Sequence, residues 1–395
     1  PLDRTSTHHD RVGGLQALVS TLIRDLRIAV VFGGDKNIPG AVINQATNQR
    51  SWKSYEPVAR DIGKALGRLG CRHVRLLVDD LGLADRLRNE RIDLVWLNTA
   101  GVQGRAAVSH AAATLELCGI PYVGHDPLTA ALLDNKPMFC RLLRALDIPV
   151  AQALAWSPLD GPDDPATDPA FAAVAAAAGS GFVVKPASGR ASLHVHHVAG
   201  AGDIRAVAHE VYQLTRNTIQ IEAFLPGREF CVAVCGPTTA TDGRLARRAR
   251  PFAFAAVERY LAPGEAIFTS MDVRPITPER MRMLDNAGDA MIIDTLHDMA
   301  ETLYQRMPLR TLVRLDVRAD AEGRLRVLEA NPKPDLKAPA ASGISLVAAG
   351  LASHGMSYDD LILSLFADRV HLMSQDEPEC LDRLLGSSRQ RCNQR

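Results

Sequence analysis

The stretch from Leu312 to Pro334, LVRLDVRADAEGRLRVLEANPKP, decides the fold of this chain. Residues 313–317 alternate apolar and charged side chains, and residues 325–328 alternate in the same way. The segment between them, 320–323, reads Asp-Ala-Glu-Gly, a composition typical of turns. The pattern therefore predicts a β-hairpin.

Period-two alternation places chemically useful side chains on one face of each arm of this hairpin. Arg314 and Asp316 share a face of the first arm, and Val327, Glu329 and Asn331 share a face of the second. Two carboxylates and an amide oxygen on neighbouring strands suit Mg²⁺, and a phosphate-bound Mg²⁺ needs only one or two carboxylates. An arginine beside them suits a phosphate group or a developing oxyanion.

A solvent-facing hairpin is the alternative interpretation, because such hairpins often carry alternating charges. The dipeptide Asn331-Pro332, close behind the acidic Glu329 at the end of an apolar strand, is harder to explain in that way. Motifs elsewhere in the sequence are needed to distinguish the two interpretations.

The composition limits the kind of protein. A chain of 395 residues is too long for one ordinary core, so we expect two or three domains. The 45 lysines and arginines balance the 45 aspartates and glutamates, and without net positive charge we expect no nucleic-acid partner. No stretch reaches the roughly 18 apolar residues of a membrane span, so we expect no membrane partner.

The cysteines and the N-terminal residues favour a cytoplasmic location. The seven cysteines are scattered, odd in number and without paired spacing, which favours reduced thiols. Cys231 and Cys235 lie far from other potential ligands in the sequence, so we expect them to pack in the core and not to bind zinc. Residues 1–14 are polar and lack the apolar region of a signal peptide.

The first part of the chain alternates strands and helices. Arg27 to Gly34, RIAVVFGG, is an apolar run ending in a glycine pair, which predicts a buried parallel strand before a loop at a ligand crevice. We further expect a helix over 54–69, strands over 74–78 and 94–97, a helix over 106–118, and a strand and turn over 120–124. This alternation predicts a parallel sheet. The third glycine of a dinucleotide fingerprint is missing, so a Rossmann dehydrogenase is disfavoured.

Two lysines in the second part are candidate phosphate ligands. Leu128 to Leu146 is predicted as largely helical with Lys136 near its start, and a surface lysine is the alternative. Gly181 to Pro186, GFVVKP, is predicted as a strand that ends in Lys185, and burial of this lysine requires an anionic partner. The loop 187–192, ASGRAS, either closes over phosphates or forms a plain hairpin turn.

Further elements lead back to the hairpin. Ile219 to Phe230, IQIEAFLPGREF, is predicted as a strand that carries Glu222, followed by a short turn that presents Glu229. Met281 to Tyr304 is predicted as a helix. Residues 371–395 are predicted as a disordered polar tail.

Together these pieces resemble the D-alanine–D-alanine ligases of the ATP-grasp superfamily. The resemblance covers about Arg27 to Val370 and depends on motifs in a fixed order, namely VFGG, GIPYVGH (119–125), DNK with Lys136, VVKP with Lys185, IEAFLPGRE (221–229), RLD (314–316), LEANP (328–332), ISLVAAG and GMSYDDLI. Each motif alone is weak, but the order and spacing of the whole set are specific.

The resemblance implies an α/β (α+β) ATP-grasp fold of three domains, with a parallel-sheet N-terminal domain and ATP held between two antiparallel sheets. The expected parts are a polar N-terminal extension over 1–26, the N-terminal domain over 27–126, a central ATP-grasp subdomain over 127–222, a C-terminal subdomain with the metal and substrate site over 223–370, and a polar tail over 371–395.

The resemblance also assigns roles to residues. The residues expected at ATP are Lys136 and Lys185 at the phosphates, Glu222, Ala223, Phe224 and Leu225 at adenine, Glu229 at the ribose, and Arg259. Those expected at Mg²⁺, normally two ions that Mn²⁺ can replace, are Asp316, Glu329 and Asn331. Those expected in catalysis are Arg314, Tyr260 and Ser192, with Arg259 and Tyr260 as a loop pair over the site. Those expected at the carboxylate of the second substrate are Ser345 and Leu346.

The implied activity is an ATP- and Mg²⁺-dependent carboxylate–amine ligase that joins amino-acid substrates through an acyl phosphate and releases ADP and phosphate. In such a reaction the protein supplies positioning and charge neutralisation in place of a nucleophile, which agrees with the lysines, arginine and carboxylates already identified. Homodimers are common in the family, so a homodimer is a further expectation.

The sequence departs from the family around the amino-acid site. Residues 98–104, NTAGVQG, lack the acidic residues of the family's turn, and the loop 35–54 lacks a clear equivalent of the glutamate that fixes the first substrate's ammonium. The lid segment reads GRASLH over 189–194. Lys333 and Asp335 stand where the family has a proline-glycine turn, and they add charge near the substrate.

These departures leave three alternatives. The enzyme joins D-alanine, or it is a ligase of a specialised pathway that joins a different amino acid or amine, or it is a nucleotide-binding protein without catalysis. The third is disfavoured because binding of ATP alone does not need Arg314 together with Asp316, Glu329 and Asn331.

Overall fold

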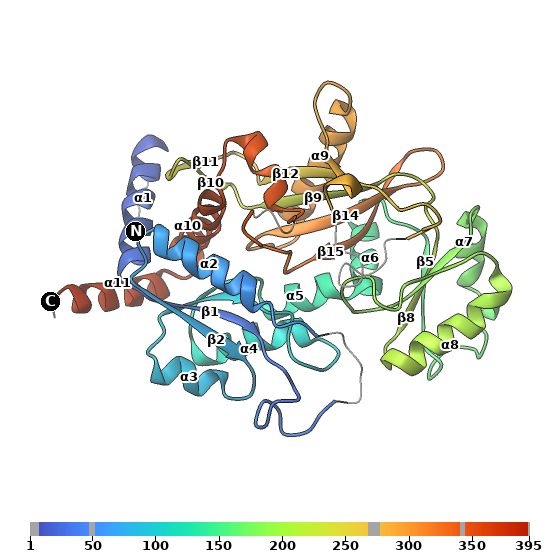
Figure 1. Cartoon of the computed structure of the whole chain (residues 1–395), viewed down its shortest axis with the longest axis horizontal. Coiled ribbons are helices and arrows are strands. Elements are labelled where there is room, and N and C mark those ends of the chain that lie inside the picture. Colours follow the sequence, from blue (N-terminus) through green and yellow to red (C-terminus); the bar gives the residue numbers. More distant parts are fainter. Residues whose placement is uncertain (1–7, 47–51, 268–276, 340–343, 394–395) are drawn as a thin grey trace.

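The computed structural model describes residues 8–46, 52–267, 277–339 and 344–393, and its fold is of the expected α/β (α+β) class. The chain forms a four-stranded parallel sheet, antiparallel sheets of four and five strands and a two-stranded hairpin, and helices pack against them (Figure 1). The shorter 3₁₀ turns are η1 Ala107–Ser109, η2 Pro165–Thr167, η3 Ala201–Asp203, η4 Pro278–Arg280, η5 Ala348–Gly350 and η6 Ala352–His354.

The N-terminal part is the predicted parallel sheet, with the strand order β2-β1-β3-β4. Its strands are β1 Arg27–Gly33, β2 His73–Asp79, β3 Leu94–Asn98 and β4 Tyr122–Val123, and its helices are α2 Glu56–Arg68, α3 Leu83–Asn89 and α4 His110–Cys118. Val30 of β1 packs in the cluster that contains Ile62 of α2, whereas Val31 packs in the cluster that contains Leu115 of α4. Both faces of β1 are therefore buried, which explains its continuous apolar run.

The central part is a four-stranded antiparallel sheet with the order β5-β8-β6-β7. Its strands are β5 Ala153–Trp156, β6 Phe182–Pro186, β7 His196–Val198 and β8 Ile219–Ala223, and the helices of this part are α5 Pro127–Asp134, α6 Lys136–Ala145, α7 Phe171–Ala177 and α8 Ile204–Thr215. The single helix predicted over 128–146 is two helices. Asn135 ends the first and caps the second, because its side chain accepts a hydrogen bond from the backbone N–H of Met138 at 3.1 Å.

The C-terminal part is a five-stranded antiparallel sheet with the order β13-β12-β9-β14-β15. Its strands are β9 Glu229–Cys235, β12 Phe252–Arg259, β13 Met281–Met283, β14 Val313–Ala319 and β15 Leu325–Asn331, beside the hairpin of β10 Thr238–Thr241 and β11 Arg244–Arg247 and the helix α9 Ala290–Arg306. The predicted hairpin is thus confirmed as β14–β15. The helix predicted from Met281 begins only at Ala290, because Met281–Met283 pairs with β12 as an edge strand.

The prediction of a disordered C-terminal tail is wrong, and the predicted N-terminal extension contains a helix. Helix α1 His8–Asp25 occupies most of the predicted N-terminal extension, and α10 Tyr358–Asp376 and α11 Pro378–Asn393 occupy the predicted disordered tail. These helices pack together (Figure 1). Their buried apolar residues include Leu15, Val19, Leu22, Ile23, Leu381 and Leu384. Apolar residues three and four positions apart indicate a helix with one buried face. The sequence analysis missed this pattern because most of the other residues in these segments are polar.

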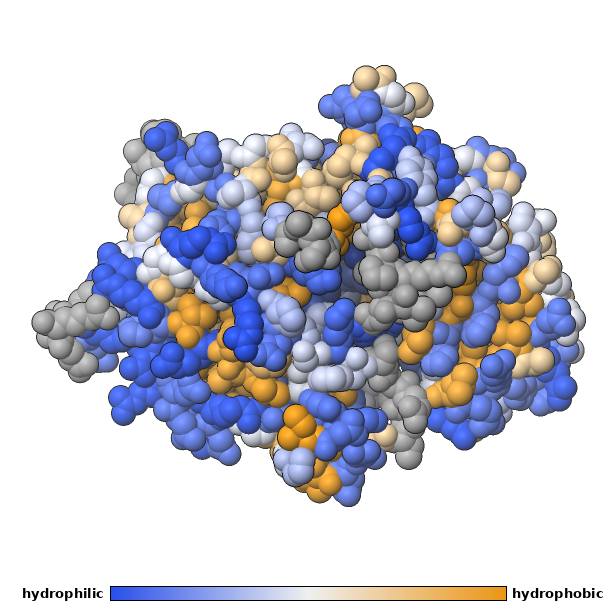
Figure 2. All heavy atoms as spheres, viewed as in Figure 1, coloured by the Kyte–Doolittle hydropathy of each residue, from blue (hydrophilic) through white to orange (hydrophobic). Residues whose placement is uncertain are grey.

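Within the described ranges, no helix has both the length and the apolar character that a membrane crossing requires. On the face in Figure 2, the coloured residues are mostly polar, and apolar ones occur in small groups. The domain boundaries, the homodimer and the cytoplasmic location stay predictions.

We expect Leu384→Ala to lower the free energy of unfolding by about 2–5 kcal/mol, because it leaves a cavity between packed helices. Leu384 is 2% exposed and belongs to the core that α1, α10 and α11 share. Urea unfolding measures the change. The matched control is exposed Asp382→Ala on the same helix, with an expected change within about 0.5 kcal/mol. Equal stabilities of the two variants would show that α11 does not pack as described.

Candidate active site

A cleft of about 800 Å³, partly open to solvent, lies between the central and the C-terminal antiparallel sheets. Residues of β6 and β8 line it on one side, and residues of β9, β14 and β15 line it on the other. The sequence-predicted residues that line the cleft are Lys136, Lys185, Ser192, Glu222, Ala223, Phe224, Leu225, Glu229, Arg259, Asp316 and Glu329. Segments far apart in sequence therefore meet at one site.

The β14–β15 hairpin positions the predicted metal ligands. Asp316 faces Glu329 across the hairpin, and Arg314 faces Asn331. A β-bulge follows the Asp316–Glu329 pair, so Val327 pairs with Val317 and packs in the apolar core. The prediction that Val327 shares a face with Glu329 is therefore wrong, because the extra residue in β15 shifts the alternation by one position.

Asp316 is buried and held by arginines. Nε of Arg314 donates to Oδ1 at 2.7 Å and its Nη2 donates to Oδ2 at 2.9 Å, a two-pronged pair. Nη2 of Arg259 lies 3.8 Å from Oδ2. Burial alone would raise the pKa of Asp316, but the charges of Arg314 and Arg259 overcome that effect and lower it below its ordinary value.

The predicted anionic partner of Lys185 is Glu222. Nζ of Lys185 lies 2.6 Å from Oε1 of Glu222, and both side chains are buried. Gln220 donates to the other carboxylate oxygen at 2.6 Å. Burial opposes the charge of Lys185, yet Glu222 and Glu329 raise its pKa. Lys136, the first residue of α6, places its ammonium 3.1 Å from Oε2 of Glu329.

Glu229 lies between two arginines. Arg259 contacts one carboxylate oxygen, and Nη1 of Arg318 lies 3.5 Å from the other. Arg259 is the last residue of β12 and is 9% exposed, so the prediction that it belongs to a covering loop is wrong. Tyr260, which follows it, is 39% exposed and does not line the cleft as described, so its catalytic role stays a prediction.

Arg318 is a site residue that the sequence analysis missed. Its guanidinium lies 4.8 Å from the ring centroid of Phe224, and it lines the cleft. The alternation that places Arg314 and Asp316 on one face of the strand continues to Arg318. The same pattern could therefore have predicted that Arg318 faces the site.

Ser192 lies in a tight turn at the cleft. Ala191, Ser192 and His194 have positive φ angles of 57°, 54° and 59°, a conformation that costs free energy in residues other than glycine. Residues 189–192 of the predicted loop line the cleft, and Nε of Arg190 donates to the hydroxyl of Tyr55 at 3.0 Å. Closure of this loop over phosphates stays a prediction.

The predicted substrate residues Ser345 and Leu346 do not line the cleft as described. The Ser345 hydroxyl donates to the carbonyl oxygen of Asp335 at 2.6 Å and accepts from backbone N–H groups that follow it. Leu346 packs with Cys231 and Val257. Their assignment to the second substrate stays a prediction.

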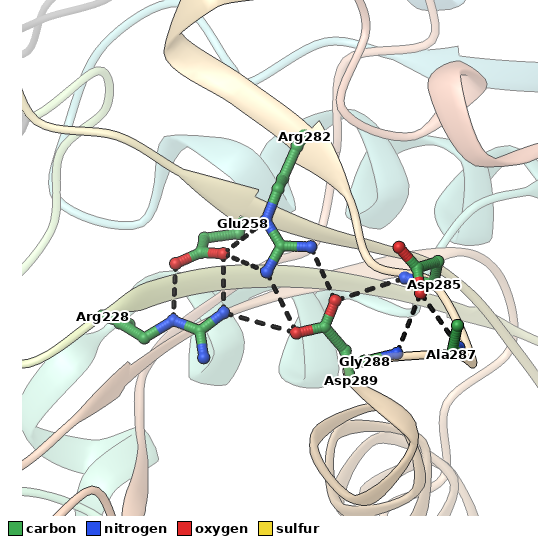
Figure 3. A network of polar contacts seen from close by, with 7 residues as sticks. All are labelled: Arg228, Glu258, Arg282, Asp285, Ala287, Gly288 and Asp289. Carbon is green, nitrogen blue, oxygen red and sulfur yellow. Dashed lines mark hydrogen bonds and ion pairs between the residues drawn. The ribbon is translucent and has the colours of Figure 1, made fainter.

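A network of ion pairs holds the edge of the C-terminal sheet beside the cleft (Figure 3). Glu258 of β12 accepts hydrogen bonds from Arg228 at 2.6 and 2.7 Å and from Arg282 of β13 at 2.9 Å. Asp289, before α9, accepts from Arg282 at 2.6 and 3.0 Å. Arg228 directly precedes β9, so the network fixes the ends of β9 and β12 that reach the cleft.

The donor set of the hairpin fits a hard cation that also binds phosphate. Asp316, Glu329 and Asn331 offer two carboxylates and an amide, and Nδ2 of Asn331 is buried without a hydrogen-bond partner among the described residues. The described ranges contain no group of three or more His, Cys, Asp or Glu side chains able to hold a metal. An ion here therefore needs further oxygen atoms, such as those of phosphates.

Comparisons find known proteins to which this chain is similar. The family profile described as D-ala D-ala ligase C-terminus matches residues 142–367. A D-alanine–D-alanine ligase of a Synechococcus species is 24% identical over 371 residues, which are 92% of this chain and 100% of that protein.

Two solved structures share the fold. D-alanyl-alanine synthetase A of Vibrio cholerae has a TM-score of 0.61 and 19% identity, over 88% of this chain and 98% of that one. The VanG D-Ala:D-Ser ligase of Enterococcus faecalis has a TM-score of 0.61 and 16% identity, over 87% of this chain and 99% of that one.

We expect Lys185→Met to lower the free energy of unfolding by about 3–5 kcal/mol, because it leaves the buried carboxylate of Glu222 without its cation. The double variant Lys185→Met/Glu222→Gln should regain most of this loss. Urea unfolding of the single and double variants measures the coupling, with exposed Lys64→Met as the control. A single variant no less stable than the control would contradict the buried pair.

Asp289 predicts a pH dependence of stability. Hydrogen bonds from Arg282 lower the pKa of Asp289 from 3.8 to about 2. A lowered pKa stabilises the fold above pH 3.8, and this contribution is lost as the pH falls through about 2. We therefore expect Asp289→Asn to be less stable than the parent at pH 6, with a difference that shrinks between pH 4 and 2 in thermal unfolding. A difference that does not change with pH would contradict this.

Proposed function

The chain belongs to the D-alanine–D-alanine ligase family, and on this basis we propose that it is an ATP-dependent ligase that joins two amino acids in a peptide bond. The observation that carries the proposal is the pairing of Asp316 with Glu329 at the cleft between two antiparallel sheets. Lys136 lies 3.1 Å from Glu329, and Arg314 holds Asp316. Such a set serves phosphoryl transfer and needs no protein nucleophile.

We assign the nucleotide to the cleft. The ammonium groups of Lys136 and Lys185 would bind its phosphates, and the positive N-terminal end of α6 adds to their charge. The segment 222–225, at the end of β8, would contact adenine, and Glu229 would accept hydrogen bonds from the ribose hydroxyls. When the nucleotide binds, its phosphates would replace Glu329 and Glu222 as the partners of Lys136 and Lys185.

We assign Mg²⁺ to Asp316, Glu329 and Asn331, with two ions as the resemblance implies. When bound, Mg²⁺ neutralises charge on the phosphates during transfer. The guanidinium of Arg314 donates hydrogen bonds to both carboxylate oxygens of Asp316. A Mg²⁺ ion bound by Asp316 would therefore share this carboxylate with Arg314.

The reaction then has two steps. One oxygen of the first substrate's carboxylate attacks the γ-phosphorus of ATP, the bond from that phosphorus to the bridging oxygen breaks, and ADP leaves. The neutral amine of the second amino acid attacks the carbonyl carbon of the acyl phosphate. The bond from that carbon to the phosphate oxygen then breaks, phosphate leaves and the amine proton passes to solvent. The guanidinium of Arg314 would stabilise the transferring phosphoryl group and the later oxyanion.

The identity of the amino acids is the open part of the proposal. The first candidate is D-alanine in both positions. The second is a different amino acid or amine, which the altered segments 98–104 and 189–194 favour. The VanG ligase joins D-Ala to D-Ser on this fold, so the fold itself accepts more than one second substrate.

We expect Glu329→Gln to lower kcat/KM for phosphate release about 100-fold or more, because it removes a charge from the phosphoryl-transfer site. Release of phosphate from ATP is measured in the presence of Mg²⁺, first with D-alanine as the substrate and then with other D- and L-amino acids, singly and in pairs. Glu322→Gln in the exposed turn of the same hairpin is the matched control, with an expected change within about two-fold.

Removal of divalent ions with a chelator should abolish phosphate release, and added Mg²⁺ or Mn²⁺ should restore it. Absence of phosphate release with every amino acid tried, for a protein that still binds ATP, would contradict the ligase. The same loss in Glu322→Gln and Glu329→Gln would contradict the assigned site.

A further inference from the structure

A second cavity, of about 570 Å³, lies at the edge of the parallel sheet where its strands end. The carboxyl ends of β3 and β4 and the segment after β15 contribute to its wall. Open α/β sheets bind ligands outside the carboxyl ends of their strands, so a small molecule is expected at this position. No described residue lines both this second cavity and the cleft assigned to the nucleotide.

Apolar residues form most of the wall of the second cavity. Buried members of this set are Trp96, Val108, Val123, Leu312, Leu336 and Leu365. Among the described residues that line the cavity there is no aspartate, glutamate or arginine. Its one lysine, Lys333, places its ammonium 3.4 Å from Oδ1 of Asn98 and 3.3 Å from the ring centroid of Tyr55. A wall of this kind suits a mainly apolar group with few polar atoms.

His125 is a buried polar side chain in this apolar wall. It is 3% exposed, and neither of its ring nitrogens has a hydrogen-bond partner among the described residues. Burial lowers the pKa of the imidazole to about 4, although the backbone of Leu312 and the charge of Asp126 act in the opposite direction. At neutral pH the ring therefore has one N–H donor and one acceptor nitrogen. A backbone carbonyl can take only the N–H, so the acceptor nitrogen needs a donor group that enters the cavity.

The cleft and the second cavity follow one another along the same face of β14. Side chains alternate along a strand, so Leu312, Arg314 and Asp316 share a face, and the residues between them pack in a different apolar cluster from Leu312. Asp316 lines the cleft and Leu312 lines the cavity. On the neighbouring strand Glu329 lines the cleft, and Pro332, three positions later, lines the cavity. The cavity therefore lies beyond Arg314, on the side away from the nucleotide base.

This order places the cavity within reach of an amino-acid substrate. Arg314 is the residue assigned to the transferring phosphoryl group, so the carboxylate that receives this group must lie near it. A step of two residues along a strand is about 7 Å. An amino acid held at Arg314 can extend a long side chain over that distance, whereas the methyl group of alanine would leave the cavity nearly empty.

We propose that the second cavity holds the side chain of an amino-acid substrate, and that His125 selects an aromatic side chain with a hydrogen-bond donor, as in tyrosine or tryptophan. This inference rests on the proposed ligase function and adds the substrate class to it. Such side chains combine a large apolar surface with one polar atom, which matches an apolar wall that contains one unsatisfied imidazole. A cationic side chain would find no carboxylate in the described part of the wall.

Amino acids that differ only in the donor test the substrate class. Tyrosine is compared with phenylalanine, and tryptophan with 3-benzothienylalanine, in which sulfur replaces the indole N–H. Each is tried in both hands, alone and with alanine, in the presence of ATP and Mg²⁺. We expect kcat/KM for phosphate release to be about 10-fold higher or more for the donor-bearing member of at least one pair, because its analogue leaves His125 unsatisfied. Equal values within both pairs, or higher values with alanine alone, would overturn the proposal.

Variants of His125 test its part in this selection. His125→Phe keeps a ring without the nitrogens and should make the two members of the pair about equal, with KM for ATP within about two-fold of the parent. His125→Gln retains a donor and an acceptor and should keep part of the preference. The matched control is His110→Phe, an exposed histidine outside the described wall, which should keep the preference within about two-fold. A purely structural role would lower the rate with all amino acids alike, so an unchanged preference in His125→Phe would overturn the proposal.

Failure of the ligase function has a different signature. If no amino acid stimulates phosphate release, the proposed function fails, and calorimetry with Mg²⁺ and a non-hydrolysable ATP analogue decides the selection by His125 separately. Binding of tyrosine or tryptophan to the parent about 10-fold tighter than binding of its analogue, with the difference lost in His125→Phe, supports the selection. Equal affinities within both pairs, or no binding to a folded parent, overturn it.

Discussion

The site depends on the pairing of charges that the fold buries in the cleft. Removal of a carboxylate or an ammonium from water costs several kcal/mol unless a partner of opposite charge joins it. Asp316 is paired with Arg314, Glu222 with Lys185, and Glu329 with Lys136. The Lys185–Glu222 pair joins two strands of the central sheet, and the Lys136–Glu329 pair joins α6 to β15. Charge compensation therefore ties α6 to the C-terminal sheet at the cleft.

The same pairing explains how a nucleotide can enter the cleft. Phosphates offer the lysines an alternative anion, and a divalent cation offers the carboxylates an alternative cation. Lys136 and Glu329 are less buried than Lys185 and Glu222, so their exchange requires the smaller rearrangement.

The sequence predicted the parts of this structure that have a periodic signal. The alternation of strands and helices along the chain predicted the parallel sheet. The period-two alternation of side chains predicted the hairpin that carries Asp316 and Glu329. The bulge in β15 was missed because the predicted alternation overlooked two consecutive apolar residues, Val327 and Leu328. The terminal helices were missed because their buried leucines are few within polar sequence.

Transfer of an ¹⁸O label from substrate to phosphate tests the central claim most directly. The amino acid that stimulates phosphate release is labelled in its carboxylate and incubated with ATP, Mg²⁺ and the second amino acid, and the released phosphate is examined by ³¹P NMR. Reaction through an acyl phosphate predicts one ¹⁸O atom in each phosphate released. Unlabelled phosphate would mean that water attacks ATP, which would contradict the ligase mechanism that this cleft is proposed to perform.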